Sequence, residues 1–433
     1  MVGMRHAITR LRASAAVAAI CLMLAPGCGS DKAAAGPAFP VNGGGPITFV
    51  IGKDDAQLFN ELIAPWNRQH PDEHVTLVLL PEAENDQLAQ LQANLQAGSS
   101  AYDVIDMDVV WTAEFASAGW IIPLSASMFP SIGESLPPAV STAEYDGRLW
   151  AVPYYSNADL LYYRKDILAA AHEKPPVTLA QLEEEASKIA PKYGLQGYAG
   201  QLSDYEGLTV NFADAVQSEG GSILSPDGSV TVDSPQAEAG LSFLVNGLRE
   251  GWIPQSALTY EEESSAADFE SGKLLFLNNW PFIYSQASQP GPDNKVVGKF
   301  AVTLLPGVDG PGSSSLGGAN LAISAFSKHQ ATAVKFINYL TSLSGERQLL
   351  IDTGFPPVWT SLYSDPAMIR MFPYLPVLEQ AIRSARPRPA VPDYDQASVA
   401  ISSAVYQALT LKTTPQRALS EMAAHLKQII SDG

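Results

Sequence analysis

Cysteine is almost absent from this 433-residue chain, in which only Cys21 and Cys28 occur. Two cysteines cannot build a disulfide framework or a zinc site of several thiolates. Positive charge is also scarce, with 26 Lys and Arg against 45 Asp and Glu and a formal net charge of −19. A surface this negative repels phosphate backbones and anionic lipids. The composition therefore argues against nucleic-acid binding and against a basic membrane-binding patch.

Motifs for common catalytic and metal-binding sites are missing too. The chain has neither a Gly-x-Ser-x-Gly nucleophile elbow nor a P-loop. His70 and His74 have the spacing of a helical metal pair, but Pro71 lies between them and favours a surface loop. We find no internal repeat of fixed period. The sequence predicts no metal and no cofactor.

Residues 1–27 have the organisation of a secretion signal. Arg5, Arg10 and Arg12 precede an Ala-rich apolar stretch over 13–25, and Cys28 follows the small residue Gly27. This arrangement resembles a bacterial lipoprotein signal, which implies lipidation of Cys28. The alternative is ordinary cleavage nearby, with Cys28 as a lone thiol. Residues 28–45, rich in Gly, Ala and Pro, predict a flexible tether, and no later run of about 18 apolar residues predicts a membrane span.

The segment from Tyr102 to Trp120 combines features that rarely occur together. It begins as an apolar strand but carries Asp103, Asp106 and Asp108 within six positions. Ionised carboxylates are seldom buried without a partner, so we expect the later ones at the carboxyl edge of the strand. Ligands of open α/β sheets bind at that edge.

Alternating strand and helix patterns precede this segment. Apolar strands over 47–51 and 75–80 alternate with helical patterns over 58–66 and 85–97, which predicts a parallel α/β unit with Gly98 after its second helix. Farther on, 332–350 predicts one helix, and Thr414 with Pro415 predicts the start of the last one. Breaks near 153, 306 and 356 indicate that the chain crosses between two lobes more than once.

The order of several motifs resembles that of carbohydrate-importer lipoproteins of the maltose-binding-like, extracellular solute-binding protein family. The shared segments span about 380 residues: 47–69, 102–104 with 115–124, 147–153 with 161–164, 269–273 with 279–281, 317–323 and 333–337. The resemblance implies an α/β, two-lobed periplasmic-binding-protein fold (type II), with a ligand cleft between lobes and several crossover hinge strands. We predict lobe 1 at 46–155 plus 303–355 and lobe 2 at 156–302 plus 356–433.

A narrower resemblance is to trehalose-binding and trehalose/maltose-binding lipoproteins. It is carried by Asp108–Ala116, Leu362–Pro366 and Arg388–Pro392. Related importers of other α-glucosides and oligosaccharides share much of this pattern, so the identity of the sugar stays open.

A neutral sugar needs planar polar side chains for its hydroxyls and an aromatic face for its C–H side. The resemblance places Asp108 and Asn157 on the sugar; their alternatives are a helix N-cap and a turn residue. Trp280 is the expected stacking platform, or else core packing. Gly318 offers a backbone N–H, or marks a bulge. Arg388 forks two hydroxyls, or forms an exposed salt bridge.

Weaker candidates complete the predicted ligand-binding set. Asp54, Asp86, Glu206 and Glu262 come from loops expected to face the cleft, with helix caps or solvated charges as the alternative. Tyr155 fits either the lining or the core. Asp103 is expected to stabilise a turn, and Trp111 to pack beneath the site.

Together with the signal pattern, the resemblance implies a lipid-anchored, monomeric, non-enzymatic binding protein on the extracellular face of the cell membrane. It would capture a disaccharide, with trehalose or a related α-glucoside first, and deliver it to the transmembrane subunits of an ABC permease driven by an ATPase. The alternatives are a secreted glycoside-active enzyme, which would need a carboxylate pair, and a binder of longer oligosaccharides.

Overall fold

The structure is a computed structural model that describes residues 41–52, 56–81, 84–225 and 227–432. All of them fall within one unit, 37–433. The predicted signal peptide, the tether up to residue 40, Cys28 and Asp54 lie outside the described residues. No helix in the described ranges is both long enough and apolar enough to cross a bilayer.

The first sheet begins with the predicted parallel unit. Strand β1 (Ile47–Ile51) pairs in parallel with both β2 (Val75–Leu79) and β3 (Val104–Asp108). Helices α1 (Ala56–Gln69) and α2 (Glu84–Gln96) make the two crossovers, and α2 buries Leu88, Leu91 and Leu95. The prediction of a parallel α/β unit is confirmed. Gly98 follows α2 at φ 63°, a left-handed conformation that glycine adopts without strain.

Three strands from later in the chain complete this sheet. The long strand β11 (Ser315–Ile323) runs antiparallel to β3, with Ala319 opposite Asp108. Strand β6 (Ala151–Ala158) pairs antiparallel with the other edge of β11, and the short β12 (Arg386–Pro387) pairs with its start. The carboxyl end of β3 therefore lies beside the middle of β11 and close to β6.

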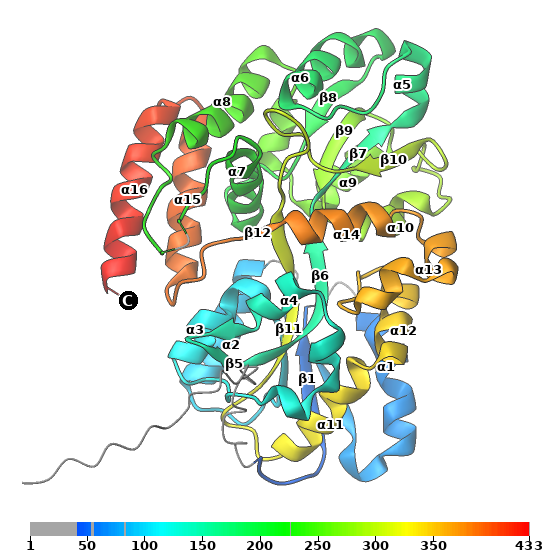
Figure 1. Ribbon diagram of the computed structural model, residues 1–433, viewed down its shortest axis with the longest axis vertical. Coiled ribbons are helices and arrows are strands. Elements are labelled where there is room, and N and C mark those ends of the chain that lie inside the picture. The colour runs from blue at the N-terminus through cyan, green and yellow to red at the C-terminus, as the bar shows by residue number, and fades with distance from the viewer. Residues whose placement is uncertain (1–40, 53–55, 82–83, 226, 433) are drawn as a thin grey trace, which may run out of the picture. The chain divides into compact units, whose positions relative to one another are not determined.

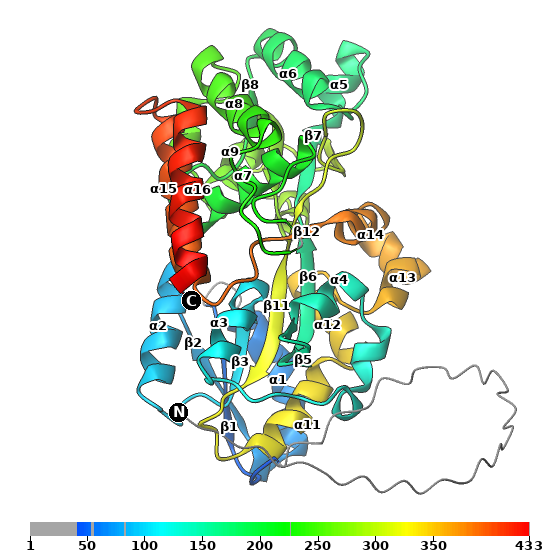
Figure 2. The ribbon, with the colours of Figure 1, turned by 60° about the vertical axis from the view of Figure 1, so that its left-hand side comes forward.

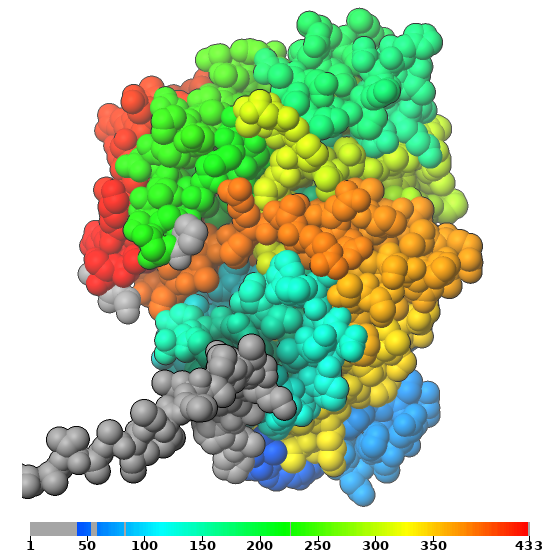
Figure 3. Space-filling model, viewed as in Figure 1, coloured from blue at the N-terminus to red at the C-terminus, as the bar shows by residue number. Residues whose placement is uncertain are grey.

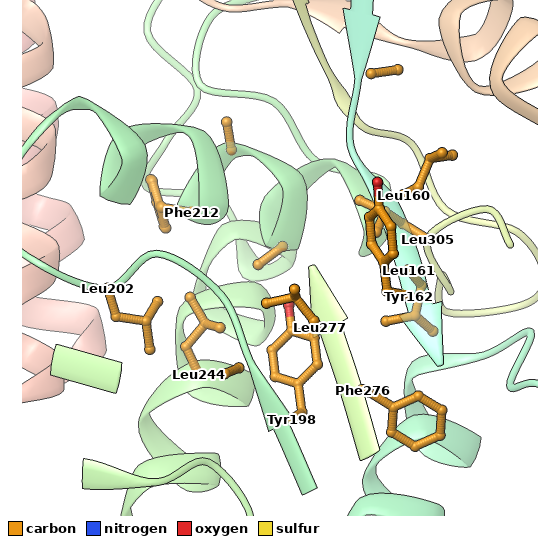
Figure 4. Close-up of a cluster of buried hydrophobic side chains, with 14 of the residues drawn as sticks. Leu160, Leu161, Tyr162, Tyr198, Leu202, Phe212, Leu244, Phe276, Leu277 and Leu305 are labelled. Atoms are coloured by element: carbon orange, nitrogen blue, oxygen red, sulfur yellow. The ribbon is translucent and has the colours of Figure 1, made fainter. Parts of the chain in front are cut away.

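The second sheet has the order β10-β7-β9-β8. Its strands are β7 (Leu160–Arg164), β8 (Gln196–Ala199), β9 (Leu274–Asn279) and β10 (Phe300–Thr303). Every residue of β9 is buried, as expected for a strand covered on both faces. Figure 4 shows side chains from β7, β8 and β9 meeting those of the neighbouring helices in this core.

Helices pack around the second sheet. They are α5 (Lys165–Ala171), α6 (Leu179–Lys188), α7 (Glu206–Ser218), α8 (Pro235–Glu250), α9 (Glu262–Glu270), α10 (Ile283–Ser288), α15 (Tyr394–Leu409) and α16 (Pro415–Asp432). Helix α7 is buried along its whole length, between α8 and α15. The amide of Arg417 donates to Thr414 Oγ1 at 3.3 Å, which confirms the predicted start of α16.

The remaining helices are α3 (Thr112–Ser117), α4 (Pro137–Thr142), α11 (Gln330–Leu340), α12 (Leu343–Thr353), α13 (Pro366–Met371) and α14 (Leu375–Ser384). The β-hairpin β4 (Glu144–Tyr145) and β5 (Arg148–Leu149) precedes β6. Figure 3 shows the orange segment that contains α14 as a band across one face of the protein.

The prediction of one continuous helix over 332–350 is wrong. The helix ends at Leu340, and α12 begins after Ser342, whose hydroxyl accepts a hydrogen bond from the Gly345 amide at 3.1 Å. A serine side chain that caps a new helix competes with continuation of the previous one. Apolar periodicity alone does not reveal such a break.

Two hydrophobic cores accompany the two sheets. One gathers side chains around β1, β2 and β3, and the other gathers side chains around β7, β8 and β9. A single residue, Asp159, separates β6 of the first sheet from β7 of the second. Figures 1 and 2 both show β6 and β11 running from the half that holds β1 toward the half that holds β7.

Candidate ligand-binding cavity

A cavity of about 390 Å³ lies where the ends of both sheets meet. Strands β3, β6 and β11 supply Asp108, Asn157 and Gly318 from the first sheet. Residues that follow β9 or begin α7 and α9 supply Trp280, Glu206 and Glu262 from the second. Because β3, β11 and β6 are hydrogen-bonded neighbours, their registers bring side chains distant in sequence to one edge.

Arg388 links the two sides of the cavity through a buried ion-pair network. Its Nη2 lies 3.0 Å from Oδ1 of Asp108, and its Nη1 lies 2.5 Å from Oε1 of Glu206. The arginine side chain is only 2% exposed. The predicted alternative for Arg388, an exposed salt bridge, is therefore wrong, since the ion pairs are buried.

Glu206 is the most heavily bonded carboxylate of this network. Tyr394 donates its hydroxyl to Oε1 at 2.5 Å, and the Ser398 hydroxyl donates to Oε2. Burial raises the pKa of Glu206, while the Arg388 charge and these two hydroxyls oppose the rise. The guanidinium of Arg388 also lies over the ring of Tyr394, 5.9 Å from its centroid.

Asp108 has a structural partner as well as the arginine. Its Oδ1 accepts a hydrogen bond from the Val110 amide at 2.9 Å, which caps the short helical turn after β3. The predicted N-cap alternative is therefore present alongside the cavity position. One carboxylate oxygen can accept from both donors, because it has two lone pairs.

Trp280 is held firmly through its main chain. Its amide donates to the Asn279 side chain at 2.7 Å, and its carbonyl accepts from the Tyr162 hydroxyl at 2.8 Å. The side chain lines the cavity and is partly exposed, so it is not simply core. Tyr162 itself is fully buried in the second core.

Asn157, Gly318 and Tyr155 line the cavity from β6 and β11. Gly318 has φ 119°, and a Cβ there would lie 2.2 Å from the Tyr155 carbonyl oxygen, so only glycine fits. The pairing register of β6 and β11 shifts just after it, between Ala319 and Asn320, which places the predicted bulge beside Gly318. The Tyr155 ring stacks on Phe355 with centroids 4.6 Å apart, which gives the cavity a second aromatic surface.

Further carboxylates surround the cavity. Tyr205 donates its hydroxyl to Glu262 at 2.8 Å, and burial raises the pKa of Glu262 to about 7. Burial, together with the charges of Asp108 and Glu206, also raises the pKa of Glu84 well above its ordinary value. Seven lining residues in the described part of the chain carry carboxylates, against one arginine. This electrostatic balance disfavours an anionic ligand.

Eight of the ten predicted ligand-binding residues lie on this one cavity: Asp108, Tyr155, Asn157, Glu206, Glu262, Trp280, Gly318 and Arg388. Asp86 does not line it, because it lies on the exposed side of α2.

Sequence reasoning missed several lining residues, among them Glu84, Gln87, Tyr205 and Phe355. The position of Glu84 and Gln87 at the start of a helix after a parallel strand was the available signal. Asp103 has a structural role, but toward the sheet: its carboxylate accepts from the Thr48 amide of β1 at 2.8 Å. Trp111 is buried against Phe115. No group of three or more metal-ligating side chains occurs within the described ranges.

Residues 52–346 match the family model for bacterial extracellular solute-binding proteins. A probable ABC transporter-binding protein of Deinococcus radiodurans is 33% identical over 83% of this chain and 87% of its own length. The maltotriose-binding protein of Pyrococcus abyssi is 24% identical over 78% of this chain and 71% of its own length. The maltose-bound MalE3 of T. maritima superposes with a TM-score of 0.83 at 32% identity, covering 88% of this chain and 99% of that one. The predicted two-lobed, type II periplasmic-binding-protein fold is confirmed.

Proposed function

Because the chain belongs to the family of bacterial extracellular solute-binding proteins, we propose that it is the sugar-binding component of an ABC importer. Its ligand is a disaccharide, with trehalose or a related α-glucoside as the first candidate. The observation that carries the proposal is the cavity in which Trp280, Asp108, Asn157 and Arg388 converge from the two lobes.

The lining has the chemistry that a neutral sugar requires. Carboxylates and amide oxygens accept from hydroxyls, the guanidinium and backbone N–H groups donate to them, and aromatic rings cover the C–H faces. Asn157 Oδ1 is buried without a partner among the described residues, as expected where a ligand completes the hydrogen bonding. A volume of about 390 Å³ lies within the range of small-molecule pockets and favours a disaccharide over a longer chain.

Capture proceeds by closure of the two lobes over the sugar. Contacts from both lobes to one ligand stabilise the closed form, and exclusion of water strengthens the hydrogen bonds inside. Arg388 takes part in this closure, since its two ion pairs already join Asp108 of the first sheet to Glu206 of α7. The closed protein then docks on the transmembrane subunits of the permease, and an ATPase drives release.

The lobe boundaries and the location of the protein are parts of the same proposal. The two hydrophobic cores support lobe 1 at 46–155 plus 303–355 and lobe 2 at 156–302 plus 356–433. Membership of an extracellular family supports secretion, and the signal pattern before Cys28 supports a lipid anchor on the outer face of the cell membrane. The protein acts as a monomer that binds sugar without changing it chemically.

Calorimetric titration with trehalose, maltose and longer glucosides tests the proposal. We expect saturable binding of a disaccharide, and loss of that binding in Asp108→Ala and in Trp280→Ala. Asp293→Ala is the matched control, because Asp293 is exposed and does not line the cavity. It should bind as the wild type does.

Three results would overturn parts of the proposal. Absence of binding to every sugar, together with measurable glycoside hydrolysis, would favour the secreted enzyme instead. Normal binding by both cavity variants would mean that the site lies elsewhere. Tighter binding of longer glucosides than of any disaccharide would leave the transport role and correct the ligand.

A further inference from the structure

We infer that Gly317 is a positioning residue: because it has no side chain, the indole of Trp280 packs against the backbone there, and this contact sets the position of the stacking surface in the cavity. This inference rests on the proposed function and deepens it. Gly317 lies on β11, next to Gly318, and pairs with Asn157 of the neighbouring strand β6. Its own atoms line the cavity together with the indole.

The contact is too close to admit a side chain. A Cβ added to Gly317 would lie 2.7 Å from Cη2 and 2.8 Å from Cζ3 of Trp280. Separations below 3.0 Å lie inside the repulsive wall of carbon–carbon contact, for which the optimum is about 3.5–4.0 Å. The benzo edge of the indole therefore rests directly on the backbone of β11.

The main chain of Trp280 cannot retreat to relieve the clash. Its amide and carbonyl are both hydrogen-bonded, to Asn279 and to Tyr162, and β9 before it is wholly buried. The ring is the part left to move. A methyl group at position 317 would tilt or lift the ring away from β11.

This contact also joins the two lobes. β11 belongs to the sheet that holds Asp108, whereas Trp280 follows β9 of the other sheet. The position of the ring on Gly317 therefore sets where the aromatic face stands relative to the hydrogen-bonding groups of Asp108 and Asn157. Gly318 differs from Gly317, because a Cβ at position 318 would meet the backbone carbonyl of Tyr155 and not the Trp280 ring.

The test is a double-mutant cycle between positions 317 and 280, read by sugar calorimetry and by thermal unfolding. We expect Gly317→Ala to weaken disaccharide binding about tenfold, which corresponds to about 1.4 kcal/mol. In a Trp280→Phe background, which keeps an aromatic face but lacks the Cη2 and Cζ3 atoms that meet position 317, the same change should alter affinity less than about twofold. Gly310→Ala is the control, since a Cβ there meets nothing within 4 Å.

Each outcome decides the inference. Equal effects of Gly317→Ala in both backgrounds would overturn it, as would unchanged affinity in the single variant. If Gly317→Ala fails to fold, the inference requires that adding Trp280→Phe restore folding, and failure of the double variant to fold overturns it. If the wild type binds no sugar, the proposed function fails. The non-additivity of the two substitutions in the unfolding temperature then still tests the contact between Gly317 and Trp280.

Discussion

Replacing Arg388 by methionine tests whether the buried ion pairs beside the cavity stabilise the folded protein. Methionine keeps the length and much of the volume of the arginine stem but removes the guanidinium. It leaves Asp108 and Glu206 without their shared cation, in a place where the arginine was 2% exposed.

The expected loss in the free energy of unfolding follows from the burial of these charges. Removing one partner of a buried ion pair costs about 3–5 kcal/mol, because an uncompensated charge stays in the interior. Glu206 keeps its bonds from Tyr394 and Ser398, and Asp108 keeps the Val110 amide. We therefore expect a loss near the lower end, about 3 kcal/mol, in the free energy of unfolding without sugar.

The loss should depend on pH with a predictable sign. Arg388 is the main group that lowers the pKa of Glu206 against its burial, so the variant raises that pKa further. A carboxyl whose pKa is higher in the folded state than in the unfolded state favours folding when protonated. The destabilisation should be largest at pH 8 and shrink as the pH falls toward about 4.5, the value for an unfolded glutamate.

Urea unfolding at pH 5 and pH 8 provides the assay, with the midpoint and slope compared between variants. Arg388→Lys should fall between wild type and Arg388→Met, because an ammonium cannot fork to two carboxylates. The surface pair Arg417–Glu421 gives the control, and Arg417→Met should leave the midpoint nearly unchanged. Equal losses at both pH values, or a loss no larger than that of Arg417→Met, would refute the reasoning.

Two further predictions concern other buried carboxyls. Burial raises the pKa of Glu185 to about 7, so this carboxyl should lower the stability of the protein as the pH rises from about 4.5 to above 7. Glu185→Gln should therefore raise the unfolding temperature above that of the wild type by more at pH 8 than at pH 5. Exposed Glu184, whose pKa Lys188 lowers, is the neighbouring control, and a larger gain from Glu184→Gln would contradict the explanation. Burial and the charge of Asp214 raise the pKa of Asp159 well above its ordinary value, which favours the neutral carboxyl, so Asp159→Asn should be tolerated. Asp214→Asn should cost more at pH 7, since Asp214 accepts from the Ser315 amide at 2.6 Å and from Asn278 at 3.2 Å; equal unfolding temperatures for the two variants would contradict this assignment.

Local patterns in the sequence determined the parallel start of the first sheet. Apolar runs that alternate with helical patterns predicted β1 to β3, and the turn and cap chemistry of Gly98 and Thr414 predicted helix ends. These signals succeed because they act over a few residues. Local patterns also placed carboxylates at a strand end, and the family resemblance selected Asp108, which lines the cavity.

Tertiary structure alone decided how the site is assembled. The antiparallel pairing of β11 with β3 brings residues some 200 positions apart into register, and nothing local encodes that partner. Tertiary packing also buries Arg388, for which the sequence left an exposed salt bridge open, and places it between Asp108 and Glu206. Asp86 and Glu84 show the same limit: the two lie on one helical turn, and only packing decides that Glu84 lines the cavity while Asp86 stays exposed.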